Sequence, residues 1–167
     1  MTMVERARVF ATAAHTAVEQ VRKYTFEPYI VHPAEVASIV ASVPHTDAML
    51  AAAWLHDTVE DTGVTIETIR AEFGEEVAEL VGWLTDVSRL EDGNRAVRKA
   101  ADREHTARAP AAAQTVKLAD LIANTRSIVK HDVAFARTYL AEKRLLLEVL
   151  TRGDAVLMAE ARATVGV

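Results

Sequence analysis

Apolar residues at spacings of three and four run through most of this sequence, and this period restricts the fold more than any other feature. Between Val4 and Val21 they fall at Ala7, Phe10, Ala14, Ala17, Val18 and Val21. That spacing places them on one face of a helix. Roughly a fifth of the residues are alanine, the strongest helix former. Alternating stretches long enough for a strand are missing, so we predict an all-α fold.

Proline, glycine and capping residues divide the chain into about eight helices. Pro33 suits the first turn of a second helix, and Thr46 or Asp47 can cap the third. Gly74 provides a left-handed stop for a helix that begins near Thr65. Apolar helices are expected over 111–129 and 133–150. Because no repeat or linker is visible, residues 1–167 are expected to form a single domain.

Charge and cysteine content limit the partners. Lys and Arg number 19 against 24 Asp and Glu, for a net charge of −5 and a pI near 5.7, which argues against nucleic acid or anionic membrane as a partner. No signal peptide or membrane-spanning stretch is readable. The absence of cysteine excludes thiolate chemistry and favours the cytoplasm. Any metal ligands must therefore be His, Asp or Glu, and homo-oligomerisation stays open.

Two His-Asp dipeptides occur, in different contexts. His56 and Asp57 lie in WLHDTVEDT, at the end of an apolar helix, where burying polar groups costs free energy unless they are paired or bind a cation. His131 and Asp132 lie at a boundary between helices. For the second pair, a capping Asp beside an exposed His is the favoured interpretation.

Further ligands must come from other helices. His32 in PYIVHP and Asp120 in VKLADLIANT are polar residues among apolar neighbours, as an inward-facing ligand would be. Two imidazoles and two carboxylates suit Mn²⁺, Fe²⁺ or Zn²⁺. The spacing is equally compatible with each His being satisfied by a neighbouring Asp in the core.

Five segments together resemble a known family: EPYIVHP (27–33), AAAWLHDTVEDT (51–62), FGEEVAELV (73–81), LTDVS (84–88) and VKLADLIANTRSI (116–128). They are similar to the metal-dependent HD hydrolase domain of RelA/SpoT proteins. As a single domain the chain most resembles the small alarmone hydrolases, the group that includes the metazoan SpoT homologue. The resemblance runs in order over roughly residues 5–150 and implies an HD-domain helical bundle.

The resemblance implies an enzyme that removes the 3′-pyrophosphate of guanosine tetra- or pentaphosphate, releasing GDP or GTP and pyrophosphate. It implies one Mn²⁺ per chain, or another divalent ion, bound by His32, His56, Asp57 and Asp120. It also implies that Glu60 and Asp61 orient and deprotonate the attacking water. A purine nucleotide is then the small-molecule partner.

Substrate contacts are implied for six residues: Arg22, Lys23, Lys117, Asn124, Arg126 and Ser127. Arg22 and Lys23 could instead be a solvated cationic end of the first helix. Lys117, one turn before Asp120, could equally be a structural partner of that carboxylate. The basic segment 93–108 could clamp 5′-phosphates, although a solvated face is the favoured interpretation.

Three alternatives to the guanosine substrate stay open. The same fold and metal could act on an adenosine alarmone, or on the 2′-phosphate of NADPH. A silent nucleotide-binding module is the non-enzymatic alternative, against which the complete set of ligands together with Glu60 and Asp61 argues.

Overall fold

The computed structural model describes residues 1–167 as ten α-helices and one 3-10 turn with no β-strand. The all-α prediction is therefore confirmed. The chain forms two compact units, residues 1–85 and residues 86–167, each described by itself. The expected single domain over the whole chain stays a prediction. No helix combines the length and hydropathy needed to cross a membrane.

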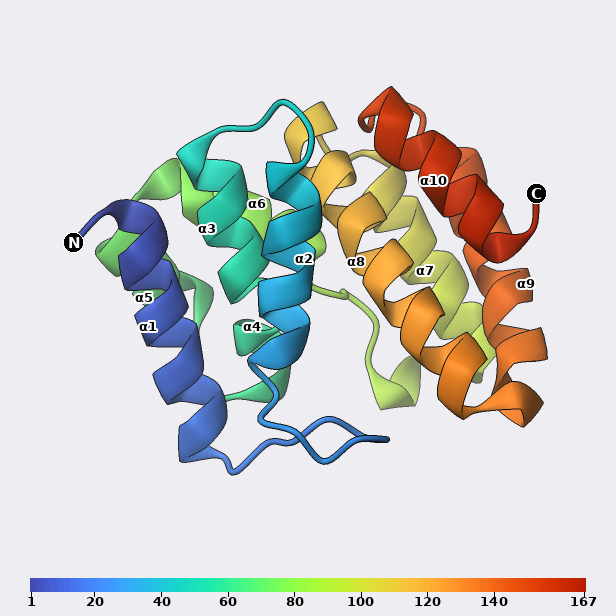
Figure 1. Ribbon diagram of the computed structural model, residues 1–167, viewed down its shortest axis with the longest axis horizontal. Helices are drawn as coiled ribbons and strands as arrows, with labels where there is room; N and C mark the ends of the chain where they lie inside the picture. Colours follow the sequence, from blue (N-terminus) through green and yellow to red (C-terminus); the bar gives the residue numbers. More distant parts are fainter. The chain divides into compact units, whose positions relative to one another are not determined.

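The first unit is built around α3 (Asp47–Leu55). This helix packs against α1 (Met3–Ala17), α2 (Val31–Ala41) and α6 (Glu75–Leu84), as Figure 1 shows. The alanines at 51–53 are fully buried, and their small side chains let the neighbouring helices approach closely. The end of α3 is thereby held inside the unit, where His56 and Asp57 follow.

The first helix is shorter than its apolar period suggested, since it ends at Ala17 and not at Val21. Val18 and Val21 are 47% and 48% exposed, so their spacing does not reflect burial. Glu19 adopts a φ of +54°, a left-handed conformation that a helix cannot continue through. Val21 instead forms an isolated antiparallel bridge with Pro28.

Capping and turn residues set the remaining helix ends of the first unit. The Thr46 hydroxyl accepts from the Met49 amide, which identifies Thr46 and not Asp47 as the cap of α3. After α4 (Thr58–Asp61), a single turn, come α5 (Ile66–Phe73) and α6. Gly74 joins these two with a φ of +89°, as the sequence predicted.

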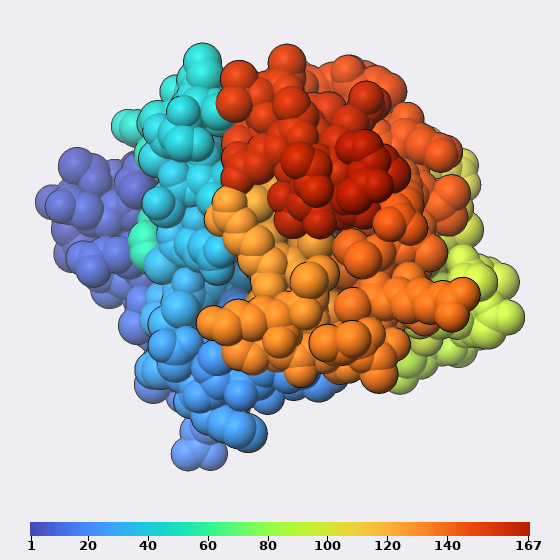
Figure 2. Space-filling view, turned by 45° about the vertical axis from the view of Figure 1, so that its right-hand side comes forward, coloured from blue at the N-terminus to red at the C-terminus, as the bar shows by residue number.

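The second unit begins with a 3-10 turn (Leu90–Asp92) and α7 (Arg95–Ala107), followed by α8 (Ala111–His131), α9 (Val133–Val149) and α10 (Ala155–Val165). α8 packs against both α9 and α10, and Figure 2 shows α10 in red against the orange surface of α8 and α9. Before α10, Gly153 approaches α8 so closely that a Cβ would lie 2.5 Å from Leu118 Cδ1. Any larger residue at position 153 would force the Leu118 side chain to shift.

The second His-Asp dipeptide has a structural role. Asp132 caps α9, since its Oδ1 accepts from the Phe135 amide at 3.0 Å. His131 is exposed at the end of α8. The sequence interpretation of this pair is confirmed.

Candidate metal and hydrolytic site

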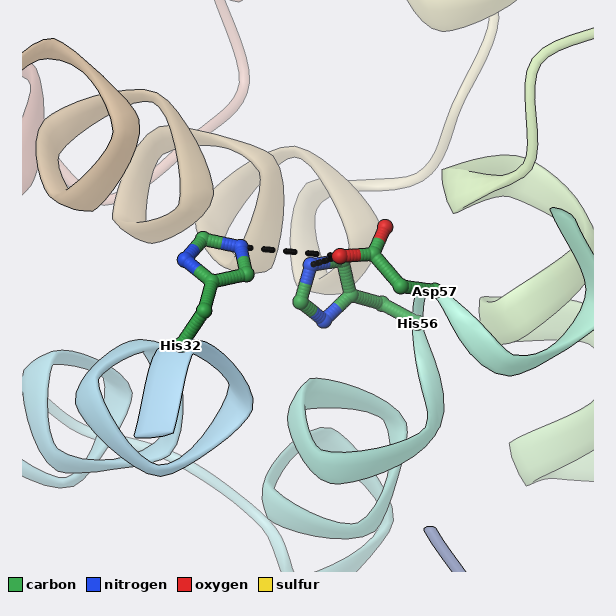
Figure 3. A group of neighbouring side chains, drawn as sticks. All are labelled: His32, His56 and Asp57. Carbon is green, nitrogen blue, oxygen red and sulfur yellow. Dashed lines mark ion pairs between the residues drawn. The ribbon is translucent and has the colours of Figure 1, made fainter. Parts of the chain in front are cut away.

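His32 enters the first unit from the first turn of α2. Its backbone amide donates to the Tyr29 carbonyl at 3.0 Å, which fixes the turn before the helix. Pro33 follows at a position where the first turn of a helix needs no amide donor. The His32 side chain is 1% exposed and faces the end of α3 (Figure 3).

His56 ends α3 and is 2% exposed. Its Nδ1 lies 2.7 Å from the Ala53 carbonyl oxygen, which can only accept a hydrogen bond. Nδ1 therefore carries the proton, and in the neutral ring Nε2 is left with its lone pair. A backbone carbonyl on the far nitrogen is the usual way a protein orients a metal-binding imidazole.

Asp57 brings its carboxylate to both imidazoles. Its Oδ2 lies 3.2 Å from His56 Nε2 and 3.6 Å from His32 Nε2, along the dashed lines in Figure 3. Tyr29 donates its hydroxyl proton to the same Oδ2 at 2.6 Å. The candidate ligand atoms of the three residues lie within 4.8 Å of one another.

This arrangement fits a divalent cation. A carboxylate oxygen faces the Nε2 lone pair of His56, and two such electron pairs repel one another unless a positive charge lies between them. Nitrogen and oxygen donors without sulfur suit Mn²⁺, Fe²⁺ or Zn²⁺. Of the four predicted ligands, His32, His56 and Asp57 are brought together in this cluster.

Glu60 and Asp61 lie on α4, the turn that follows the ligand pair. The Asp61 amide donates to the Asp57 carbonyl at 3.0 Å, so the two carboxylates are one helical turn apart. Partial burial raises the pKa of Asp61, and the nearby Asp57 charge acts in the same direction. A hydrogen bond from Gln20 opposes both effects.

Sequence reasoning missed a network that supports Asp61. Gln20 donates from Nε2 to Asp61 Oδ2 at 3.1 Å, and its Oε1 lies 2.7 Å from Nδ1 of His15. His15 is 1% exposed, and its ring lies 4.8 Å from that of Tyr29. A signal was available: His15 falls four residues after Ala11, on the buried stripe of α1.

The same network fixes the orientation of the Gln20 amide. Its NH₂ must face the Asp61 carboxylate, so its oxygen accepts from His15. His15 is then protonated on Nδ1. Gln20 thus holds one oxygen of Asp61 in place, through a contact between residues 41 positions apart.

Asp120 lies on the buried side of α8, in the second unit. Asn124 Nδ2 donates to Asp120 Oδ1 at 2.8 Å, and Lys117 Nζ lies 3.5 Å from Asp120 Oδ2. Both partners are predicted substrate contacts. The pairing of Lys117 with Asp120 matches the structural alternative that the sequence left open.

Two of the other predicted substrate residues belong to the first unit and two to the second. Arg22 and Lys23 lie in the loop after α1, where the Arg22 amide donates to the Glu27 carbonyl at 2.8 Å. Arg126 forms an ion pair with Glu160 of α10, and Ser127 is the next residue of α8. These positions leave their roles in binding as predictions.

The basic segment 93–108 contributes to a groove as well as to the solvent-exposed face of its helix. Arg95, Lys99 and Arg103 recur every four residues along α7 and line a groove of about 640 Å³ with Arg137 of α9. Glu142 is the single acidic residue on this surface and is paired with Arg95. A positively charged groove on an acidic protein favours an anionic ligand.

Comparison with known proteins agrees with the fold. A model of the HD domain family matches residues 7–146. The chain is 38% identical over 129 residues to a probable guanosine-3′,5′-bis(diphosphate) 3′-pyrophosphohydrolase of Synechocystis, covering 75% of this chain and 17% of that protein. A protein of Xenopus tropicalis with the name guanosine-3′,5′-bis(diphosphate) 3′-pyrophosphohydrolase is 41% identical over 104 residues, covering 60% of this chain and 56% of that one.

Among solved structures, the chain resembles one described as a metazoan ortholog of SpoT that hydrolyses ppGpp. The TM-score is 0.86 at 26% identity, covering 98% of this chain and 94% of the other. By contrast, the chain spans about a sixth of the length of the bacterial relatives from Synechocystis and Mycobacterium leprae, 17% and 16% respectively.

Proposed function

We propose that this protein, which belongs to the HD domain family, is a metal-dependent hydrolase that removes the 3′-pyrophosphate of guanosine tetra- or pentaphosphate. The observation that carries the proposal is the convergence of His32, His56 and Asp57, with Glu60 and Asp61 one turn beyond. The names of the relatives supply the substrate. The products are GDP or GTP and pyrophosphate.

The ligand cluster would hold Mn²⁺, with Asp120 proposed as the fourth ligand. A bound divalent ion lowers the pKa of water to about 7 and offsets charge on a phosphoryl group. Within the chain, the Ala53 carbonyl and the Tyr29 hydroxyl orient His56 and Asp57. These two hydrogen bonds would keep the lone pairs of His56 and Asp57 directed at one point.

Glu60 and Asp61 would orient the attacking water and take its proton. Asp61 suits this role because its raised pKa makes it a better proton acceptor than an exposed carboxylate. Gln20 binds the other side of the same carboxyl group and limits its rotation. Positioning of this kind is the main contribution a protein makes to phosphoryl transfer.

The substrate would be held by cationic and amide side chains. We propose Arg22, Lys23, Lys117, Asn124, Arg126 and Ser127 as its contacts, and the α7–α9 groove as the site of the 5′-phosphates. Four cations line that groove, and the charge of a 5′-diphosphate matches them. We place the reaction in the cytoplasm, which the cysteine-free sequence favours.

The test is hydrolysis of guanosine and adenosine 3′-pyrophosphate nucleotides side by side, with and without Mn²⁺, followed by anion-exchange chromatography. We expect pyrophosphate release that a chelator abolishes, with the guanosine substrate turned over faster. His56→Ala should lose the activity, and His131→Ala, which alters the histidine of the other His-Asp pair, should keep it. Equal activity of the two variants would refute the proposal.

NADPH completes the comparison of substrates. Release of inorganic phosphate from NADPH, without pyrophosphate release from either alarmone, would reassign the site to the 2′-phosphate substrate.

A further inference from the structure

His15 is a buried residue of α1 that is neither a predicted metal ligand nor a predicted substrate contact. It is 1% exposed and lies on the same face of the helix as the buried Ala7 and Ala11. Its Nδ1 lies 2.7 Å from Gln20 Oε1, whereas its Nε2 is buried without a hydrogen-bond partner in the protein. An unpaired buried polar atom costs free energy, so an apolar side chain would suit this position better if packing were its only role.

A left-handed residue brings Gln20 back beside the end of α1. Glu19 adopts a φ of +54°, which is unfavourable for a residue that has a Cβ atom. The Gln20 amide then donates to the His15 carbonyl at 3.1 Å, and the Gln20 carbonyl accepts from the Tyr29 amide at 3.2 Å. Both backbone groups of Gln20 are therefore fixed. Strain of this kind persists where surrounding contacts maintain it, and it is concentrated at functional sites.

The side chain of Gln20 connects His15 to Asp61. Gln20 Nε2 donates to Asp61 Oδ2 at 3.1 Å, so the amide oxygen is left to accept the Nδ1–H of His15. The reversed amide would place acceptor oxygens against each other at Asp61 and N–H groups against each other at His15. As long as Nδ1 carries the proton, His15 therefore selects the orientation in which Gln20 holds the Asp61 carboxylate.

The same segment reaches the candidate metal ligand Asp57. Tyr29, whose amide binds Gln20, donates its hydroxyl proton to Asp57 Oδ2 at 2.6 Å. The rings of His15 and Tyr29 lie 4.8 Å apart, a distance typical of packed aromatic rings. One set of contacts at the end of α1 thus orients both the carboxylate of the ligand and the carboxylate of Asp61 one turn beyond it.

We propose that His15 is a positioning residue of the hydrolytic site. Its Nδ1–H orients the Gln20 amide, and Gln20 in turn holds the Asp61 carboxylate toward the attacking water. The inference rests on the proposed function and adds to it a residue that touches neither the substrate nor the metal. Because a misplaced base slows the reaction without weakening substrate binding, His15 acts on kcat and not on KM.

The test compares His15→Asn with His15→Gln, using Mn²⁺ and whichever of the three nucleotides the wild type hydrolyses fastest. The amide nitrogen of Asn lies near the position of Nδ1, whereas that of the longer Gln lies near the position of Nε2. We expect His15→Gln to lower kcat about tenfold and to leave KM within about twofold. His15→Asn, which restores a donor to Gln20, should keep kcat within about threefold of the wild type. A packing role predicts the opposite order, since Gln is closer to His in volume.

A double variant shows whether His15 acts through Gln20. Once Gln20→Leu has removed the amide, adding His15→Gln should lower kcat by no more than about twofold, because the two residues act in series. Full additivity of the two losses would overturn the proposal. His45→Gln is the matched control, since His45 Nδ1 also lies 2.7 Å from an oxygen, but that oxygen is the Val43 carbonyl. Its kcat should equal that of the wild type.

Nitrogen-15 NMR of the wild-type histidines gives a readout that needs neither a variant nor activity. The long-range ¹H–¹⁵N spectrum distinguishes the two neutral tautomers, and His15 should be protonated on Nδ1. A ring that carries its only proton on Nε2 would overturn the proposal, even if every His15 variant failed to fold.

The kinetic outcomes separate this inference from the proposed function. A wild type that holds Mn²⁺ but hydrolyses none of the three nucleotides would overturn both. An active wild type would overturn this inference alone if His15→Gln kept full kcat, if His15→Asn and His15→Gln lost equal activity, or if only KM changed.

Discussion

The ligand cluster of the first unit and a small cavity of the second unit, lined by Lys99, Arg103, Lys117 and Lys143, gather charged side chains in different ways. In the cluster, a carbonyl and a hydroxyl orient an imidazole and a carboxylate so that electron pairs converge. In the cavity, Asp102 accepts hydrogen bonds from backbone amides, Glu142 pairs with Arg95, and Lys99 lies near Asp86. The first arrangement suits a cation, whereas the second sets cationic side chains among carboxylates that already have other partners.

The comparison teaches that the groups around a charged residue determine what it can bind. Asp57 and Asp102 are both partly or fully buried carboxylates that accept hydrogen bonds. Asp57 keeps an oxygen facing two imidazoles, whereas Asp102 accepts three hydrogen bonds from one loop. Asp57 can therefore bind a metal, and Asp102 fixes the loop before α7.

The largest effect is expected from Asp57→Asn, which keeps the shape of the side chain and removes its charge. Loss of a ligand from a metal hydrolase costs about 3–4 kcal/mol of transition-state stabilisation, or about 10²–10³ in kcat/KM. Metal content by plasma emission spectrometry should fall in parallel. Asp132→Asn, a change at the capping Asp, should leave stability, metal content and activity close to those of the wild type, because Asn caps a helix about as well as Asp.

Tyr29→Phe should weaken metal binding about 10–100-fold, because it removes the hydroxyl that orients Asp57 Oδ2. Titration with Mn²⁺ measures this loss. Tyr139→Phe, a buried tyrosine of the second unit, is the matched control and should bind metal as the wild type does. Equal affinities for all three proteins would mean that the hydrogen bond to Asp57 does not tune the cluster.

Gln20→Leu should reduce kcat by about tenfold and shift the acid limb of the pH profile to higher pH. Burial raises the pKa of Asp61, and the Gln20 hydrogen bond lowers it by favouring the charged form. Without that bond the pKa rises further, so Asp61 becomes protonated at a higher pH. A lower kcat with an unshifted acid limb would show that Gln20 acts only on packing.

Lys143→Met is expected to have the smallest effect and to be stabilising. At pH 7, it should raise the free energy of unfolding by about 1 kcal/mol, because a partly buried charge is replaced by an apolar side chain. The folded pKa of about 8 lies below the unfolded value. Wild-type stability should therefore rise as the pH increases from about 8 to about 10.4, where the unfolded chain binds more protons.

Urea unfolding at pH 7 and pH 10 measures this difference. The gain in Lys143→Met should shrink at pH 10, since the wild-type lysine is neutral there. A variant that is less stable than the wild type at pH 7 would show that protein groups already compensate the ammonium.

Much of the fold could be predicted from local patterns. The apolar period gave the all-α class, and Thr46, Gly74 and Asp132 marked helix ends because each acts through its own backbone neighbours. The apolar period wrongly predicted that Val18 and Val21 belong to the first helix. Both side chains are exposed beyond its end. His32 was a candidate partner of His56 and Asp57 because it is a polar residue in an apolar segment, and the family resemblance implied the convergence that the structure shows for these three residues.

The sequence by itself determined the helices and which polar residues are forced inward, since both depend on spacing along the chain and on side-chain chemistry. Tertiary structure alone decided the contact of Gln20 with Asp61, the hydrogen bond from Tyr29 to Asp57 and the gathering of cations from three helices around Lys143. Each of these depends on which groups meet after packing. A hydrogen bond or an electrostatic imbalance acts over a few ångströms, and residues that are far apart in sequence come that close only in the folded chain.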